Sequence, residues 1–234
     1  MSLYTIGDTH LSLGTAKPMD VFRGWEGYLQ KLEENWRALV RPGDTVVIPG
    51  DISWAMTLPE AEADFRFLES LPGEKILLKG NHDYWFTTRT GVERFLEEKG
   101  VRSIRILFNN AFAREGWAIC GTRGWVNEST VPAADQKVID REAGRLRLSL
   151  EAGRQLGLPL LAFLHYPPVY YVNECREILE VLHEYGVKRC YYGHIHGTGH
   201  RYAVDGLFEE IDFRLVAGDY VRFCPVKVDG NCGG

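Results

Sequence analysis

The sequence lacks several features that would place it in a specialised class of proteins. Its five cysteines, Cys120, Cys175, Cys190, Cys224 and Cys232, are scattered and never form a C-x-x-C pair, which argues against a disulfide framework and against a structural zinc site. No apolar run approaches the roughly 20 residues that cross a bilayer, and no secretion signal is recognisable. We therefore expect a cytoplasmic protein with no membrane partner.

The sequence also lacks an excess of positive charge. The formal net charge is −5 and the chain has no long basic run, whereas proteins that neutralise many nucleic-acid phosphates carry a basic patch. Nucleic acid is therefore a poor candidate for a partner. A small phosphorylated substrate remains compatible with this charge, because two divalent cations at one point would dominate the local field. The oligomeric state stays open.

What the chain does contain is an alternation of predicted strands and helices. Short apolar runs predict core strands at 3–7, 45–49, 74–80, 158–165 and 188–194. Apolar residues at three- and four-residue steps predict helices at 21–40, 59–71, 132–156 and 175–186. An antiparallel meander is expected over 103–122, and further antiparallel strands beyond residue 198.

This alternation also predicts the architecture. Strands separated by helices pair in parallel through right-handed crossovers. The chain has no repeat, low-complexity tract or linker, so we expect one domain over residues 1–234. Its fold class is predicted as α/β, a four-layer sandwich of two mixed β-sheets flanked by helices.

Polar residues collect at the carboxyl ends of the five predicted core strands. They are Asp8-Thr9-His10, Asp51, Asn81-His82-Asp83, His165, and His194 with His196. Of the seven histidines, only His183 and His200 lie elsewhere. Because open α/β sheets bind ligands at this edge, we expect these side chains to share one site.

Each motif has a simpler explanation when it is taken alone. Gly50-Asp51 and Gly80-Asn81 are common loop openings, and the stretch GHIHG (193–197) suits a polar turn as well as a metal site. If these simpler explanations held for every motif, all five would stand at equivalent strand ends by coincidence. The complete set therefore favours a metal site.

In chain order, GDTH (7–10), GDIS (50–53), GNHD (80–83), His165 and GHIH (193–196) resemble the motifs of the calcineurin-like metallophosphoesterase family. The resemblance spans residues 7–196. It implies an αββα sandwich with a dinuclear metal centre that hydrolyses phosphate esters. It also implies two sets of ligands with Asp51 as the bridge between them: Asp8, His10 and His196 for one metal, and Asn81, His165 and His194 for the other.

The residue types agree with this chemistry. Imidazole and oxygen ligands without thiolate suit manganese, iron or zinc better than calcium, and the choice among the three stays open. A carboxylate such as Asp51 readily spans two cations. Metal-bound water loses its proton near neutral pH, which would supply a hydroxide for attack at phosphorus.

His82 and Asp83 are the candidate catalytic residues outside the ligand set. His82 resembles the family histidine that lies near the metals without binding them, and Asp83 resembles the carboxylate that orients its ring. We expect His82 to assist the leaving oxygen as a general acid or by hydrogen bonding. The alternative is a histidine that only caps the loop.

The chain departs from the family's protein phosphatases, which read GDxVDRG and GNHE and use an arginine to grip the phosphate. The corresponding motifs in this sequence are GDISWAM and GNHDYWF. They favour a phosphodiester or a small nucleotide as the substrate over a monoester. Arg123 is a candidate substitute for the missing clamp. Pairing of Arg123 with a carboxylate is the alternative.

Aromatic residues follow two of the metal-bearing loops. Trp54, Tyr84 and Trp85 are candidates for a substrate-binding wall on which a base could stack, although core packing explains such residues more often. The segment 126–142 has no place in the core pattern and is a candidate lid or subunit contact.

The leading prediction is thus a dinuclear metal-dependent phosphoesterase. A protein phosphatase or a nuclease of the same fold is an alternative within the enzyme class. A non-catalytic scaffold that retains the metal site is the alternative outside it. The complete set of ligands favours an enzyme.

Overall fold

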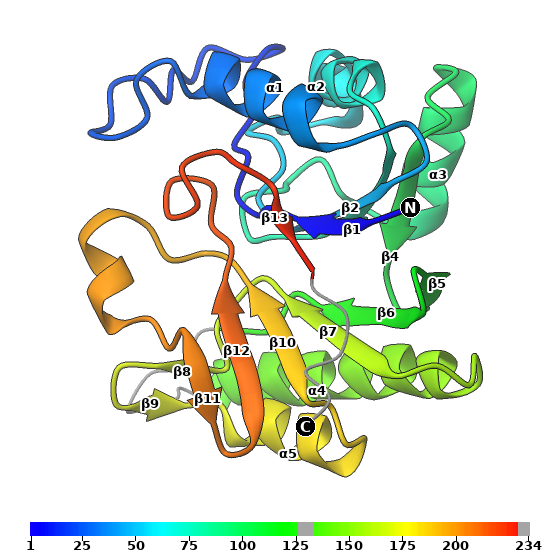
Figure 1. Cartoon of the computed structure of the whole chain (residues 1–234), viewed down its shortest axis with the longest axis vertical. Coiled ribbons are helices and arrows are strands. Elements are labelled where there is room, and N and C mark those ends of the chain that lie inside the picture. Colours follow the sequence, from blue (N-terminus) through cyan, green and yellow to red (C-terminus); the bar gives the residue numbers. More distant parts are fainter. Residues whose placement is uncertain (126–132, 229–234) are drawn as a thin grey trace.

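The computed structural model describes residues 1–125 and 133–228 of the chain. Two β-sheets pack face to face, and helices cover the outer face of each sheet (Figure 1). The α/β class and the four-layer arrangement predicted from the sequence are therefore confirmed.

The first sheet has five strands in the order β13-β1-β2-β3-β4. Their bounds are β1 Leu3–Thr5, β2 Thr45–Pro49, β3 Glu74–Leu78, β4 Ile104–Leu107 and β13 Val226–Lys227. Strands β1 to β4 pair in parallel, while β13 is antiparallel to β1. The residues of β1, β2 and β3 are almost all buried instead of alternating between buried and exposed, because both faces of the sheet are covered.

The second sheet has six strands in the order β11-β12-β10-β7-β6-β5. Their bounds are β5 Phe112–Arg114, β6 Trp117–Thr122, β7 Leu160–Leu164, β10 Arg189–Tyr192, β11 Gly206–Phe208 and β12 Ile211–Leu215. The four central strands are parallel, and β5 and β11 pair antiparallel at the two edges. A small hairpin joins β8 (Val169–Tyr170) to β9 (Asn173–Glu174).

Helices form the two outer layers (Figure 1). They are α1 Tyr28–Leu39, α2 Leu58–Ser70, α3 Arg89–Glu98, α4 Ala133–Arg154 and α5 Arg176–Glu184, with a 3₁₀ segment η1 at Gly197–Tyr202. The first three share an apolar cluster with the outer face of the first sheet, and α4 and α5 share one with the second sheet. In the described part of the chain, no helix is long and apolar enough to cross a membrane.

The core between the two sheets holds them in register. Phe163 on β7 and Tyr191 on β10 stack with ring centroids 5.3 Å apart and lie against buried aliphatic residues of the first sheet. The two sheets are therefore clamped at their middle, which fixes how the ends of their strands face one another.

Two predictions about the elements were wrong, and a third was incomplete. Helix α1 begins at Tyr28 instead of residue 21, because Gly24 and Gly27 take left-handed φ angles of 93° and 63° ahead of it. Strand β4 is not part of a meander, because its buried residues pair in parallel with β3, and only β5 and β6 form a hairpin. The antiparallel strands expected beyond residue 198 are present, because β11 pairs antiparallel with β12 and β13 with β1, but β12 also lies parallel to β10. Helix α3 had not been predicted.

Candidate metal centre

The two sheets contribute to one cluster of side chains. Strands β1, β2 and β3 of the first sheet and β7 and β10 of the second lead into loops that meet, and the predicted ligands converge there in two groups. One group is Asp8, His10 and His196, and the other is Asp51, His165 and His194. Within each group the potential ligand atoms lie within 4.8 Å of one another.

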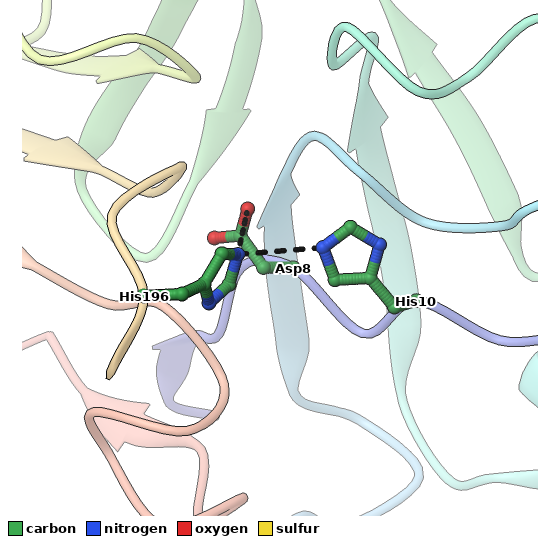
Figure 2. Close-up of side chains that lie close together, drawn as sticks. All are labelled: Asp8, His10 and His196. Atoms are coloured by element: carbon green, nitrogen blue, oxygen red, sulfur yellow. Dashed lines mark hydrogen bonds and ion pairs between the residues drawn. The ribbon is translucent and has the colours of Figure 1, made fainter. Parts of the chain in front are cut away.

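Figure 2 shows the first of these groups. Asp8 and His10 extend from the loop after β1, while His196 reaches them from the loop after β10. The Nε2 atoms of His10 and His196 are 3.3 Å apart, and Nε2 of His196 lies 3.6 Å from Oδ1 of Asp8. Residues 186 positions apart in sequence thus point at one spot.

Asn81 completes the second group. Its Oδ1 lies 2.6 Å from Nε2 of His165 and 3.0 Å from Nδ1 of His194. The Asp51 carboxylate faces both groups, with Oδ2 3.7 Å from Nε2 of His10 and Oδ1 3.5 Å from Nε2 of His165. This position between the groups is the one a bridging ligand needs.

The backbone at the site is held in an unusual conformation. Asp8, His10, Asp51 and His194 have φ angles of 54°, 42°, 50° and 72°, in a left-handed region that costs non-glycine residues on the order of 1–3 kcal/mol each. Such a conformation persists only where the surrounding structure enforces it. Its occurrence at four predicted ligands indicates that their placement is strongly constrained.

Glycines allow the loops to approach this closely. A Cβ atom on Gly193 would lie 2.2 Å from Oδ2 of Asp8, and one on Gly80 would lie 2.2 Å from the backbone nitrogen of Asp51. No side chain fits at either position. The glycines in GHIH and GNHD are therefore required by the close approach of the loops.

The donor atoms fit a bound metal. Burial lowers the pKa of His165 to about 3, so the ring is neutral and carries one proton. Its Nδ1 lies 3.1 Å from the carbonyl oxygen of Pro49, to which it donates that proton. The remaining Nε2 then presents a lone pair to Oδ1 of Asn81, another acceptor. A cation bound by both atoms would satisfy them.

Burial also favours the neutral imidazole at two other positions. It lowers the pKa of His10 well below its usual range, with the positive charge of His196 as the next cause. It lowers the pKa of His194 to about 3. A neutral imidazole is the form that binds a metal.

Asp219 belongs to the site and was missed in the sequence analysis. It accepts a hydrogen bond from Nδ1 of His196 at 2.8 Å and another from the backbone of Gly197. Although burial disfavours the charged ring, hydrogen bonds to Asp219 and Asp8 raise the pKa of His196 to about 10. The sequence holds a signal for it, because VAGD (216–219) repeats the apolar-Gly-Asp pattern of 6–8.

Asp83 has a different role from the one expected. It accepts hydrogen bonds from the backbone of Ile52, Ser53 and Gly80 and from the indole of Trp85. The Nδ1 atom of His82 is buried and has no hydrogen-bond partner among the described residues. Asp83 therefore ties two metal-bearing loops together and does not orient the ring of His82.

A pocket of about 500 Å³ opens over the candidate ligands. His82 lines it, and so does Trp54, whose ring stacks on His10 at 4.9 Å and lies 4.3 Å from that of His82. Residues 19–25, which had been assigned in part to a helix, supply Met19, Phe22, Arg23 and Trp25 to the wall.

The remaining predicted contacts do not line this pocket. Trp85 is 1% exposed and packs on Phe65, so the core explanation holds for it. Tyr84 is 52% exposed and its ring lies 6.2 Å from that of His82. Arg123 pairs with Glu142 and lines another cavity. The segment 126–132 lies outside the described residues, and the rest of 126–142 forms the beginning of α4.

Two mixed sheets with helices outside, meeting at an edge rich in histidine and aspartate, define the class of this protein as an α/β sandwich with a candidate metal site. A model of the calcineurin-like phosphoesterase family matches residues 1–198. The chain belongs to this family. Together with the two candidate metal-binding groups, this membership supports a metal-dependent phosphoesterase.

Solved structures share the fold at low sequence identity. A protein of unknown function, AQ665 from Aquifex aeolicus, is similar at 16% identity and a TM-score of 0.54, with 97% of this chain and 95% of that chain covered. The phosphopantetheinyl hydrolase PptH from Mycobacterium tuberculosis is similar at 14% identity and a TM-score of 0.55, with 100% and 97% covered. Among curated proteins there is no significant match.

Proposed function

We propose that this protein is a dinuclear metal-dependent phosphohydrolase that acts on phosphodiesters or small nucleotides in preference to monoesters. The observation that carries the proposal is the position of Asp51, whose two carboxylate oxygens face one donor group each. Asp8, His10 and His196 would hold one ion. Asn81, His165 and His194 would hold the other.

Two manganese, iron or zinc ions would polarise the phosphoryl oxygens and lower the pKa of a coordinated water. The chain's own residues supply the rest. Asp219 holds the ring of His196 in place through Nδ1, and the carbonyl of Pro49 does the same for His165. Such partners orient a ligand before the metal arrives.

The walls of the pocket support the preference for diesters. Trp54 and Phe22 present apolar ring surface beside the candidate ligands, which suits a base or another organic group on the second ester oxygen. Arg23 is the one guanidinium among the described residues lining this pocket, and it is exposed. A dianionic monoester, which benefits most from a buried bidentate arginine, would find none there.

Hydrolysis assays test the proposed function. The metal-loaded protein should hydrolyse bis-p-nitrophenyl phosphate with a higher kcat/KM than p-nitrophenyl phosphate. A reversed preference would contradict the proposed substrate class. Failure to hydrolyse either compound, with two metal ions bound per chain, would favour the non-catalytic scaffold.

His82 is the proposed donor to the leaving oxygen. His82→Ala should lower kcat by about 10²–10⁴-fold while the metal content stays near that of the wild type. His183→Ala serves as the control, because His183 is exposed and pairs with Glu209 away from the pocket. A matching loss of bound metal in His82→Ala would instead identify His82 as a ligand.

A further inference from the structure

A second cavity lies at the carboxyl ends of β3, β4 and β6, where helix α4 covers them. Its volume is about 210 Å³, and it shares no lining residue with the pocket over the metal centre within the described ranges. It is thus distinct from that pocket. Ligand sites for drug-sized molecules span about 300–1,000 Å³, so this cavity suits a smaller ligand.

The lining of the cavity is strongly basic. Among the described residues that line it, the cationic side chains are Lys79, Arg123, Arg141 and Arg145, and the one carboxylate is that of Glu142. The chain as a whole has a formal charge of −5. Because four cations around so small a space repel one another, their gathering at one point costs free energy unless a negative charge joins them.

Glu142 does not neutralise this group. The carboxylate is fully buried, and it binds Arg145 at 2.6 Å, Arg123 at 3.5 Å and the hydroxyl of Thr122 at 2.7 Å. All of its charge is therefore shared between two arginines. Arg141 has no ion-pair partner among residues 1–125 and 133–228.

Two of the cations also retain unused hydrogen-bonding capacity. The Nε atom of Arg123 is buried and lacks a hydrogen-bond partner in the described part of the chain. Lys79 donates to the carbonyl oxygen of Phe86 at 2.9 Å, which leaves protons of its ammonium group for other acceptors. An oxyanion would relieve both the repulsion and the missing hydrogen bonds.

We propose that this cavity binds a small oxyanion of the phosphate type, and that it does so independently of the metal centre. Guanidinium groups match the spacing of two phosphate oxygens, which lysine alone does not. Thr87 and Asn109 line the same space and offer neutral polar groups. The cavity is too small for a nucleotide and is built for a single oxyanion.

Calorimetric titration of the metal-loaded full chain with inorganic phosphate tests this proposal. Two binding events are expected for the wild type. Arg141→Gln should weaken one event by about tenfold or more, and Arg141→Gln combined with Arg145→Gln should abolish it. Asp51→Asn should remove the other event and leave this one unchanged.

The control is Arg147→Gln, on the same helix but paired with Glu184 outside the cavity. It should leave both events intact. A single event in the wild type that is lost in Asp51→Asn would overturn the proposal, and so would two events that persist unchanged in Arg141→Gln. Loss of Arg145 leaves the buried Glu142 without its nearest ion-pair partner and could unfold the protein. Arg141 is exposed, so Arg141→Gln alone still tests the site in that case.

Discussion

At the scale of single residues, the candidate metal centre depends on groups that do not bind the metal themselves but fix the ligands and their loops by hydrogen bonds. Asp219 is the clearest of these, because it fixes the ring of His196 through one hydrogen bond and the following backbone through another. Asp83 acts in a comparable way on the loops after β2 and β3. Neither residue belongs to the two groups of ligand atoms.

Asp219→Asn should therefore reduce metal affinity by about 10–100-fold, because the amide holds the Nδ1–H of His196 less strongly than the carboxylate does. Competition with a chelator measures the change. Asp205→Asn is the matched control, because Asp205 accepts from Tyr220 nearby without touching a ligand. Unchanged affinity in Asp219→Asn would remove Asp219 from the site.

Lys75 provides a test of burial that is separate from the metal centre. It lies fully buried on β3, donates to Ser103 and to the carbonyl of Leu71, and burial lowers its pKa to about 8. Below pH 8 it is protonated in both states. Between about 8 and its ordinary value near 10.5 the unfolded chain binds more protons, so its contribution to stability rises with pH.

The free energy of unfolding of the wild type, taken relative to Lys75→Met, should therefore increase by about 2 kcal/mol between about pH 7 and 9.5. Urea denaturation at the two pH values measures it. Lys188→Met, at an exposed ion pair, should show almost no such change. A difference that does not vary with pH would show that Lys75 titrates normally in the fold.

At the scale of elements, the loops after the strands matter more than the strands themselves. The loops after β1, β2, β3 and β10 bring their ligands inward through a left-handed residue or a glycine without room for a side chain. One position in α4 offers a contrast. A Cβ atom on Gly144 in that helix would meet nothing within 4 Å.

Two glycine substitutions should thus have opposite effects on stability. Gly193→Ala should destabilise the fold by about 1–3 kcal/mol and weaken metal binding, because its methyl group would displace the Asp8 carboxylate. Gly144→Ala should stabilise the fold by about 0.5–1 kcal/mol, because alanine restricts the unfolded chain and suits a helix. Urea denaturation and chelator competition check both; equal effects would contradict the close approach at Gly193.

At the scale of the whole molecule, the site exists because two sheets are held in one relative position. The first sheet supplies Asp8, Asp51 and Asn81, and the second supplies His165, His194 and His196. The layer between the sheets, centred on Phe163 and Tyr191, is what keeps these two halves together.

Phe163→Ala should cost about 3–5 kcal/mol in the free energy of unfolding, because it empties the middle of that layer. It should also weaken metal binding, since His165 follows two residues later, directly after the same strand. Leu207→Ala is the control, because Leu207 is 76% exposed and its loss should change stability by less than about 0.5 kcal/mol. Wild-type metal affinity in a destabilised Phe163→Ala would show that the layer supports the fold alone.

Local patterns were sufficient for most elements and for the set of candidate ligands. Continuous apolar runs marked β2, β3, β7 and β10 because buried parallel strands need apolar residues on both faces, and the polar residues directly after them marked the edge of the sheet. The same reasoning failed for β4, whose short apolar run is compatible with either direction of pairing. It also failed at residues 21–27, because the helical spacing of the apolar residues there was given more weight than the glycines among them.

The sequence by itself determined which side chains stand at the ends of the core strands and what chemistry they offer. Only the tertiary structure decided that Asp219 supports His196, that Asp83 binds loops instead of the ring of His82, and that Arg123 turns to Glu142 and a second cavity. The physical reason is the separation in sequence between the residues that interact. Strands, helices and loop openings depend on residues a few positions apart, whereas hydrogen bonds and ion pairs between distant loops depend on how the two sheets pack.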